Sequence, residues 1–322
     1  MKKLFAIFLV FTLILTVPMF YNNYIEENTN GLTQVKKPEY RFSLIVPLSD
    51  NRYWRILEDG VKEAGKKFNV DTKCVGSSHL NTEEQIEFIR AAIASNVDGI
   101  ITAACESGEF NQTVKDARNH GIPVLLVDSD SPSSNRNMYI GTDNLKAGRE
   151  VGEAMVKATG GKAKIGILVS LADEVNQRER VAGFKSVIGS YPDMEVITVA
   201  EGKSDLPLIN ERVNRMFDQY PEINAMFCTE GFGPVGTGGV IRSRGLNGRV
   251  TVIGFDDLSE TLGYVKDKTF YATVVQRQKQ MGYLAVENLI KYCRGQTVQN
   301  SVIDTGVEIV TKDNINTYMN QK

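Results

Sequence analysis

Two aspartates each follow a short apolar segment, one in each half of the chain. Asp128 ends the segment Ile122-Pro-Val-Leu-Leu-Val-Asp128, and Asp256 ends Val250-Thr-Val-Ile-Gly-Phe-Asp256. Short apolar runs bounded by glycine or proline predict buried parallel strands. In open α/β sheets, ligands bind beyond the carboxyl ends of such strands. We therefore expect these two carboxylates to face a ligand from equivalent positions of two similar halves.

Further polar and aromatic residues follow predicted strands or open predicted helices. Aromatic side chains can cover the apolar face of a ligand, whereas amides, carboxylates and a guanidinium bind its hydroxyl groups. Taken alone, each residue could instead be a core aromatic, a helix cap, a turn carboxylate or a solvent-exposed arginine. Together they indicate a neutral ligand with many hydroxyl groups. These residues are Asn51, Tyr53, Trp54, Arg178 (opening a helix predicted over 178–190), Glu230 and Gln276.

A metal-dependent enzyme is a remote alternative. Asp128-Ser-Asp130 after a buried strand resembles the Asp-x-Asp pattern of magnesium-dependent phosphohydrolases, in which the first aspartate is the nucleophile. Asp256 and Asp257 would then be metal carboxylates, but the segment that starts at Ser131 lacks the helix-opening pattern of that class. The two histidines lack metal-ligand spacing, and neither a Gly-x-Ser-x-Gly motif nor a phosphate-binding loop is present. We therefore expect a protein without enzymatic activity, cofactor or metal.

Strand and helix patterns alternate from Phe42 onward and start again near residue 144. This alternation predicts parallel sheets with right-handed crossovers, and about ten strands in two similar halves predict two doubly wound α/β lobes. Tyr139–Thr142 is expected to be a short crossing segment. The predicted strands cover residues 42–48, 71–76, 99–102, 123–127, 163–169, 194–199, 225–228, 250–255 and 272–275.

The amino-terminal residues predict export. Lys2 and Lys3 precede an apolar run from Leu4 to Phe20, which is typical of a secretory signal or a signal anchor with its basic end in the cytoplasm. No Ala-x-Ala-like site follows closely, and the first cysteine, Cys74, is too distant for lipid attachment. These observations favour an anchor in the cytoplasmic membrane, with cleavage and secretion as the alternative. The remaining chain is expected on the extracytoplasmic face.

Charge and cysteine content narrow the classes of partner and of fold. The formal net charge of −2 gives no basic footprint, so a nucleic-acid partner is not expected. An exported protein could pair its cysteines. However, three of the four lie in or beside predicted buried strands, which favours free thiols that behave as small apolar residues. The four are Cys74, Cys105, Cys228 and Cys293.

From Arg41 to about Thr311, the chain resembles the type I periplasmic sugar-binding proteins, the group that binds ribose, galactose and xylose. The resemblance implies two Rossmann-like lobes joined by a three-strand hinge, with the sugar between them. Residues 1–39 would then be a signal or anchor and a linker. Residues 40–142 plus 277–304 would form the N-terminal lobe, and 143–276 plus 305–322 the C-terminal lobe. The motifs are Phe42-Ser-Leu-Ile-Val-Pro-Leu, Asp59-Gly-Val-Lys-Glu-Ala64, Val97-Asp-Gly-Ile-Ile101, Gly121-Ile-Pro-Val124, Arg178-Glu-Arg-Val-Ala-Gly-Phe184, Val252-Ile-Gly-Phe-Asp256 and Ala272-Thr-Val-Val-Gln276.

The resemblance also implies a site and a role. Glu230 replaces the asparagine or aspartate common in the family, and Ser129 stands where some members have arginine, so pentose and hexose both remain open. An anchored member is expected to present its sugar-bound form to a membrane sensor kinase. Supplying a sugar ABC permease is the alternative role. The implied sugar-binding residues are Asn51, Tyr53, Trp54 and Asp128 from the first lobe, and Arg178, Glu230, Asp256 and Gln276 from the second lobe and hinge.

Overall fold

The computed structural model describes residues 37–105 and 107–320. Glu39–Lys322 form one compact unit. The anchor predicted at Leu4–Phe20 lies outside the described residues. Within the part that is described, no helix has the length and apolar character needed to cross a bilayer.

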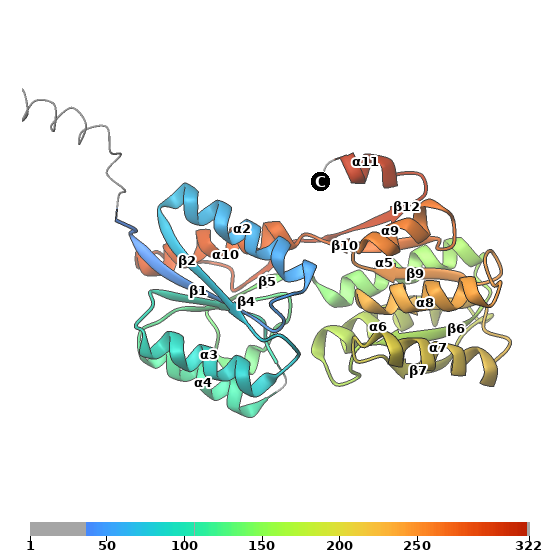
Figure 1. The fold of residues 1–322 in the computed structure, drawn as a ribbon, viewed down its shortest axis with the longest axis horizontal. Coiled ribbons are helices and arrows are strands. Elements are labelled where there is room, and N and C mark those ends of the chain that lie inside the picture. Colours follow the sequence, from blue (N-terminus) through green and yellow to red (C-terminus); the bar gives the residue numbers. More distant parts are fainter. Residues whose placement is uncertain (1–36, 106, 321–322) are drawn as a thin grey trace, which may run out of the picture. The chain divides into compact units, whose positions relative to one another are not determined.

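The first sheet has six parallel strands in the order β11-β5-β4-β3-β1-β2 (Figure 1). Helices α2 (Arg52–Phe68) and α10 (Gln278–Cys293) pack together on one face. Helices α3 (Thr82–Ala94) and α4 (Gly108–Asn119) cover the other. The strands are β1 Tyr40–Val46, β2 Val70–Gly76, β3 Gly99–Thr102, β4 Val124–Val127, β5 Met138–Gly141 and β11 Val302–Asp304, with a 3₁₀ turn at Pro132–Ser134.

The second sheet repeats this plan in the order β12-β10-β9-β8-β6-β7, and only β12 runs antiparallel to its neighbour among the described strands. Helices α5 and α6 cover one face, while α7, α8 and α9 cover the other. The strands are β6 Ala163–Val169, β7 Met194–Glu201, β8 Ala225–Cys228, β9 Thr251–Phe255, β10 Ala272–Gln276 and β12 Val307–Thr311. The helices are α5 Asn144–Thr159, α6 Val175–Ile188, α7 Leu206–Gln219, α8 Phe232–Ser243, α9 Ser259–Lys266 and α11 Ile315–Asn320.

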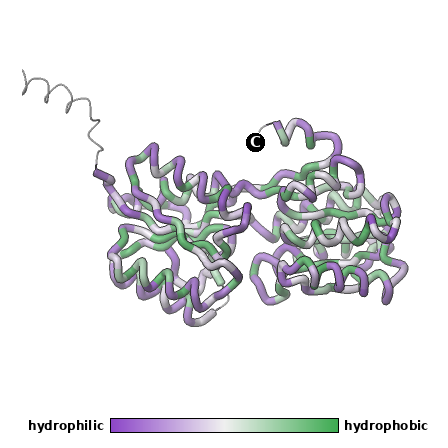
Figure 2. The backbone as a smooth tube through the Cα atoms, viewed as in Figure 1, coloured by the Kyte–Doolittle hydropathy of each residue, from purple (hydrophilic) through white to green (hydrophobic). Residues whose placement is uncertain are grey.

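Hydrophobic residues run along the strands of both sheets, as Figure 2 shows. The central strands β3 and β4 are buried at every position. Strands covered on both faces need apolar side chains on both faces, which explains their continuous rather than alternating apolar pattern. The expectation of two doubly wound α/β lobes is confirmed. Cys74, Cys228 and Cys293 are free thiols, as expected, and burial raises the pKa of Cys228 to about 12.

The chain passes between the two sheets three times, after β5, after β10 and after β11. The segment Tyr139–Thr142 differs from its prediction as a crossing. Most of it belongs to β5, which pairs with β4 and β11, and the crossing follows it. The sequence pattern also missed β11 and β12. Both are short, and the side chains of β11 are largely exposed, so they carry little apolar signal.

Helices α5 and α6 approach closely because each carries a glycine at the contact. A Cβ atom on Gly148 would lie 2.1 Å from the carbonyl oxygen of Arg180, and one on Gly183 would lie 2.0 Å from that of Leu145. Both distances are far below van der Waals contact, so only glycine fits. This close packing fixes the position of α6, which carries several of the side chains described below.

Candidate functional site

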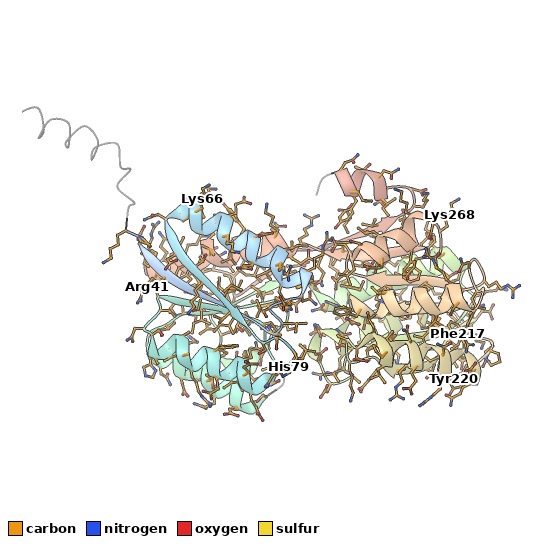
Figure 3. All side chains as sticks on the ribbon, in the orientation of Figure 1. Arg41, Lys66, His79, Phe217, Tyr220 and Lys268 are labelled. Atoms are coloured by element: carbon orange, nitrogen blue, oxygen red, sulfur yellow. The ribbon has the colours of Figure 1, made fainter. Side chains whose placement is uncertain are left out.

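A cavity of about 470 Å³ lies at the carboxyl ends of strands from both sheets. Its walls include residues that follow β1, β3 and β4 of the first sheet and β6, β8 and β9 of the second. The volume falls within the range of small-molecule sites. Figure 3 orients the first lobe: Arg41 lies at its outer end, and His79, beyond the carboxyl end of β2, lies toward the second lobe. Seven of the eight predicted site residues line the cavity: Asn51, Tyr53, Trp54, Asp128, Glu230, Asp256 and Gln276.

Asp128 and Asp256 occupy equivalent positions, one residue beyond β4 and β9. Both have left-handed backbone conformations, with φ of 65° and 63°. The amide of Asp128 donates to the carbonyl of Ile140 (3.3 Å), and that of Asp256 donates to the carbonyl of Val274 (2.7 Å). Aspartate tolerates this conformation better than most residues. Each strand therefore ends in the same turn, and both carboxylates line the cavity.

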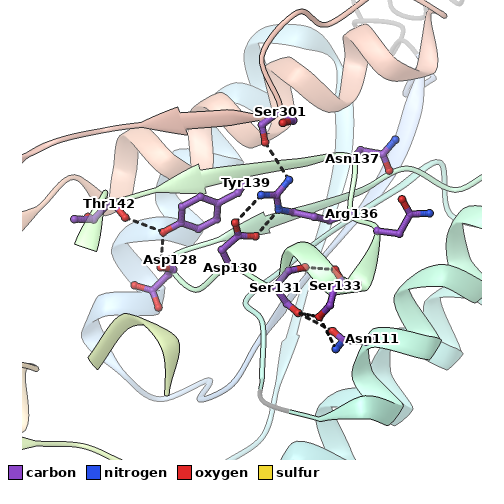
Figure 4. A network of polar contacts seen from close by, with 12 residues as sticks. Asn111, Asp128, Asp130, Ser131, Ser133, Arg136, Asn137, Tyr139, Thr142 and Ser301 are labelled. Atoms are coloured by element: carbon purple, nitrogen blue, oxygen red, sulfur yellow. Dashed lines mark hydrogen bonds and ion pairs between the residues drawn. The ribbon is translucent and has the colours of Figure 1, made fainter. Parts of the chain in front are cut away.

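Asp128 is held by hydroxyl groups of its own lobe. The Tyr53 hydroxyl donates to its carboxylate, as does Ser129 Oγ at 3.2 Å. The Tyr139 hydroxyl lies 2.8 Å from the Asp128 carbonyl oxygen and 3.1 Å from that of Thr142 (Figure 4). Burial raises the pKa of Asp128, and the nearby Arg180 and the hydroxyl donors oppose that rise. The carboxylate retains accepting capacity for a ligand hydroxyl, because an ionised carboxylate offers about four lone-pair sites.

Asp256 is held by the hinge strand β10. Gln276 Nε2 donates to Asp256 Oδ1 at 3.0 Å, and Thr273 Oγ1 donates to the Asp256 carbonyl oxygen at 2.7 Å. Burial raises the pKa of Asp256 to about 6, against the opposing effects of Arg180 and the Gln276 hydrogen bond. Gln276 Oε1 in turn accepts from Thr142 Oγ1 at 2.9 Å. Asp256 is therefore connected to both of the first two crossings between the sheets.

Arg180, and not Arg178, is the buried arginine that lines the cavity. Its side chain is only 2% exposed, and the guanidinium lies 3.9 Å from the ring centroid of Phe255. It donates to Asn144 Oδ1 (2.8 Å), the Thr229 carbonyl oxygen (2.7 Å) and Gln276 Oε1 (3.3 Å).

Arg178 is exposed, does not line the cavity, and donates to the carbonyl oxygen of Asp173. The prediction failed because α6 begins at Val175, three residues earlier than expected. Arg178 therefore lies in the solvent-facing part of the first turn.

Two of the predicted binding residues also have structural roles. Asn51 caps α2, with its Oδ1 accepting from the Tyr53 amide at 2.7 Å. The Glu230 carboxylate accepts from the amides of Phe232 (2.9 Å) and Gly233 (2.7 Å), at the start of α8, where the helix dipole favours negative charge. Trp54 packs edge-on against Tyr53, with 5.1 Å between ring centroids.

The polar residues of the cavity that sequence reasoning missed include Arg180, Glu174 and Asn176. Asn176 Nδ2 donates to Ser129 Oγ at 3.2 Å, a contact between the two lobes. The signal for Arg180 was available, since it stands four and eight residues before the apolar Phe184 and Ile188 and so shares their face of the helix. Glu174 and Asn176 gave no comparable pattern.

The arrangement contradicts the phosphohydrolase alternative. Both carboxylate oxygens of Asp130 are bound by the Arg136 guanidinium, one of them at 2.5 Å (Figure 4). Asp257 Oδ2 accepts from the Tyr318 hydroxyl at 2.6 Å. Among the residues described, no group of three or more histidine, cysteine, aspartate or glutamate side chains could hold a metal ion. The carboxylates proposed for catalysis thus serve to build the cavity.

Comparisons with known proteins agree with this geometry. The pattern of the family described as the periplasmic binding protein domain matches residues 42–297. The D-ribose/D-allose-binding protein of Pseudomonas aeruginosa is 25% identical over 84% of this chain and 88% of its own. An ABC transporter solute-binding protein from Burkholderia graminis, solved with D-arabinose, is 32% identical, with a TM-score of 0.84 over 88% of this chain and 99% of that one.

A structure of a XylFII–LytSN complex matches with 31% identity and a TM-score of 0.79, over 86% of this chain and 98% of that one. The family match spans most of the described chain, and two of these structures exceed 30% identity. The curated relatives are binding proteins, in keeping with a protein that is not an enzyme. This chain belongs to the periplasmic binding protein family, in the type I sugar-binding group.

Proposed function

We propose that this chain closes around one monosaccharide, a pentose or a hexose, on the extracytoplasmic side of the membrane. One observation carries the proposal: polar side chains from both sheets converge on a single cavity of about 470 Å³. Its walls offer carboxylates, amides and two guanidinium groups next to three aromatic side chains. Hydroxyl groups both donate and accept, so this mixture suits a sugar better than it suits an apolar or a metal ligand.

The proposed contacts follow from the geometry. Asp128 and Asp256 accept from sugar hydroxyls, Gln276 and Arg180 donate, and Tyr53 and Trp54 cover the apolar face of the ring. Asn51 and Glu230 contribute only where their capping bonds leave accepting capacity. Arg180 takes the role first expected of Arg178, because Arg180 lines the cavity and Arg178 does not.

Lobe closure is the proposed response to the sugar. Sheet membership supports rigid lobes of residues 40–142 plus 277–304 and 143–276 plus 305–322, joined by the three crossings. A ligand that contacts both lobes binds the closed arrangement more tightly than the open one, and its differential affinity sets the shift. The hydrogen bond from Asn176 to Ser129 adds a direct link between the lobes next to Asp128.

The proposed partner of the closed form is a membrane sensor kinase, reached through an anchor at Leu4–Phe20. The sequence of that segment supports the anchor, and the complex of XylFII with LytSN supports binding to a second protein. Delivery of sugar to an ABC permease is the alternative, favoured by the D-arabinose-bound relative, which is described as an ABC transporter component.

Thermal unfolding of the purified protein with a panel of pentoses, hexoses and inositols tests the binding function. A sugar at 100 times its dissociation constant adds about 2.7 kcal/mol of stability, enough to raise Tm by a few degrees. We expect a shift with one or two sugars, lost in Asp256→Ala. The absence of a shift with every sugar would reject the proposal.

The role can be tested separately in cells that lack this protein. A sensing role predicts that the transcriptional response to the sugar is lost while uptake of labelled sugar continues. Loss of uptake would instead establish the transport alternative. The mature amino terminus, measured by mass spectrometry, tests the anchor, and a terminus beyond Asn30 would remove it.

A further inference from the structure

Carboxylates greatly outnumber cations around the cavity. Seven acidic side chains line it, but only two arginines do, and one of these, Arg52, is exposed to solvent. A low-dielectric site with this excess of negative charge favours cationic groups and repels anionic ones. The acidic residues are Asp128, Asp130, Asp173, Glu174, Glu230, Asp256 and Asp257.

Five of these carboxylates already accept hydrogen bonds from the protein. Asp130 is bound by Arg136, and Asp257 by the Tyr318 hydroxyl. The other three are held by hydroxyl, amide or backbone donors, as described above. Asp173 is exposed at the edge. The remaining carboxylate is Glu174, which lines the cavity and differs from the other six in its surroundings.

Glu174 lies directly before α6 and is partly buried. Within residues 37–105 and 107–320, its carboxylate accepts no hydrogen bond and takes part in no ion pair, and it does not cap the helix. Burial and the negative charges of Asp128 and Glu230 raise its pKa to about 7, and Arg180 opposes the rise. A partly buried carboxylate that no protein group binds can accept hydrogen bonds from a ligand.

Arg180 does not donate a hydrogen bond to the Glu174 carboxylate. Its three hydrogen bonds run to an amide oxygen of Asn144, a carbonyl oxygen of Thr229 and the amide oxygen of Gln276. None of the ion pairs found among the described residues includes Arg180. Three of the five N–H groups of Arg180 therefore donate to neutral oxygens, and Arg180 acts on Glu174 only through its charge.

We propose that Glu174 pairs with an ammonium group of the bound sugar, so that the cavity prefers amino sugars to their neutral parents and rejects sugar acids. This inference rests on the proposed sugar-binding function and assigns the ligand class of the same site. An ionised carboxylate forms a stronger hydrogen bond with an ammonium than with a hydroxyl group. The preference should therefore be about tenfold or more in dissociation constant.

Calorimetric titration of the full-length protein at pH 7 tests the proposal. The ligands are D-glucosamine and D-galactosamine, their neutral parents D-glucose and D-galactose, the N-acetylated forms, and D-glucuronate. The N-acetylated forms carry a substituent at the same position without its charge. We expect the amino sugar to bind about tenfold more tightly than its parent and N-acetylated form, and glucuronate not to bind.

Two variants connect the preference to one side chain. Glu174→Gln keeps the shape and removes the charge, so it should reduce the ratio of amino-sugar to parent affinity to about one while the parent still binds. Glu179→Gln removes an exposed charge from α6 that does not line the cavity and should leave the ratio within about twofold of wild type.

The results that would overturn the inference differ from those that would overturn the proposed sugar-binding function. A neutral parent that binds as tightly as its amino sugar, or an unchanged ratio in Glu174→Gln, rejects the charge selection and leaves sugar binding intact. Wild-type protein that binds none of these sugars but binds a pentose or another hexose of the thermal-unfolding panel rejects the inference alone, whereas protein that binds no sugar of either panel rejects both the inference and the proposed function.

Discussion

Replacing Asp256 by asparagine should make the sugar-free protein more stable at neutral pH. The asparagine side chain would keep the shape of the aspartate and an oxygen that can accept from Gln276 Nε2. Asparagine also tolerates the left-handed backbone at this position, where φ is 63°. The substitution therefore removes a buried negative charge with little change in packing.

The size and sign of the effect follow from the raised pKa. The pKa of Asp256 is about 6 in the folded protein, against an ordinary value of 3.8 for this side chain. The folded state thus binds this proton more tightly, so the stability that the protonated carboxyl contributes is lost as pH rises from 3.8 through 6. At 1.36 kcal/mol per pH unit, the ionised carboxylate costs up to about 3 kcal/mol at pH 7.5 and about 1 kcal/mol at pH 4.5.

Urea unfolding of wild type and Asp256→Asn at both pH values measures this difference. We expect the variant to gain up to about 3 kcal/mol at pH 7.5, a smaller gain at pH 4.5, and weaker sugar binding. Asp71→Asn, a change of an exposed aspartate on β2, controls for net charge. A gain that is equal at the two pH values, or a loss at pH 7.5, would refute the assignment of the cost to ionised Asp256.

Four further predictions concern the cavity and the residues around it. Arg180→Met should lower the free energy of unfolding by about 3 kcal/mol or more in urea, because it removes the guanidinium that donates to three buried oxygen acceptors. Arg178→Ala should leave sugar affinity within about twofold of wild type. Asp130→Asn breaks a largely buried ion pair and should cost about 3 kcal/mol by chemical denaturation, and a cost below about 0.5 kcal/mol would show that the pair is dispensable. Tyr318→Phe removes a donor from the Asp257 carboxylate and should lower stability by about 1.5 kcal/mol; an unchanged urea midpoint would contradict that contribution.

The features that the sequence predicted are those encoded within a few neighbouring residues. Each of the two central aspartates follows an apolar run that can only be a buried strand, so strand, turn and side-chain direction are set locally. The cap of α3 is equally local, since Asn81 Oδ1 accepts from the Glu84 amide three residues later at 3.1 Å. The fold class follows because each lobe repeats such local units.

The prediction that Arg178 faces the ligand was wrong because it assumed that the helix begins at Arg178, whereas α6 begins at Val175. Arg178 and Arg180 are two positions apart on the helix, so their side chains point in directions about 200° apart around its axis. Only one of the two can therefore face the cavity. Arg180, Phe184 and Ile188 share one face of α6 because they are four residues apart, and all three are buried. The apolar spacing of α6 was therefore better evidence than the position of an arginine relative to an assumed cap.

The charge balance of the cavity could not be predicted from any one segment. Glu174, Glu230 and Asp256 follow β6, β8 and β9, and each alone resembles a helix-start or turn carboxylate. The fold brings these strand ends to one cavity with Asp128 of the other lobe, where each negative charge opposes ionisation of the next. A ligand that donates to these carboxylates favours their ionised forms, whereas an anionic ligand adds to the repulsion. Selection by charge is thus a consequence of tertiary convergence, and it is strongest at Glu174, which lacks a donor of its own.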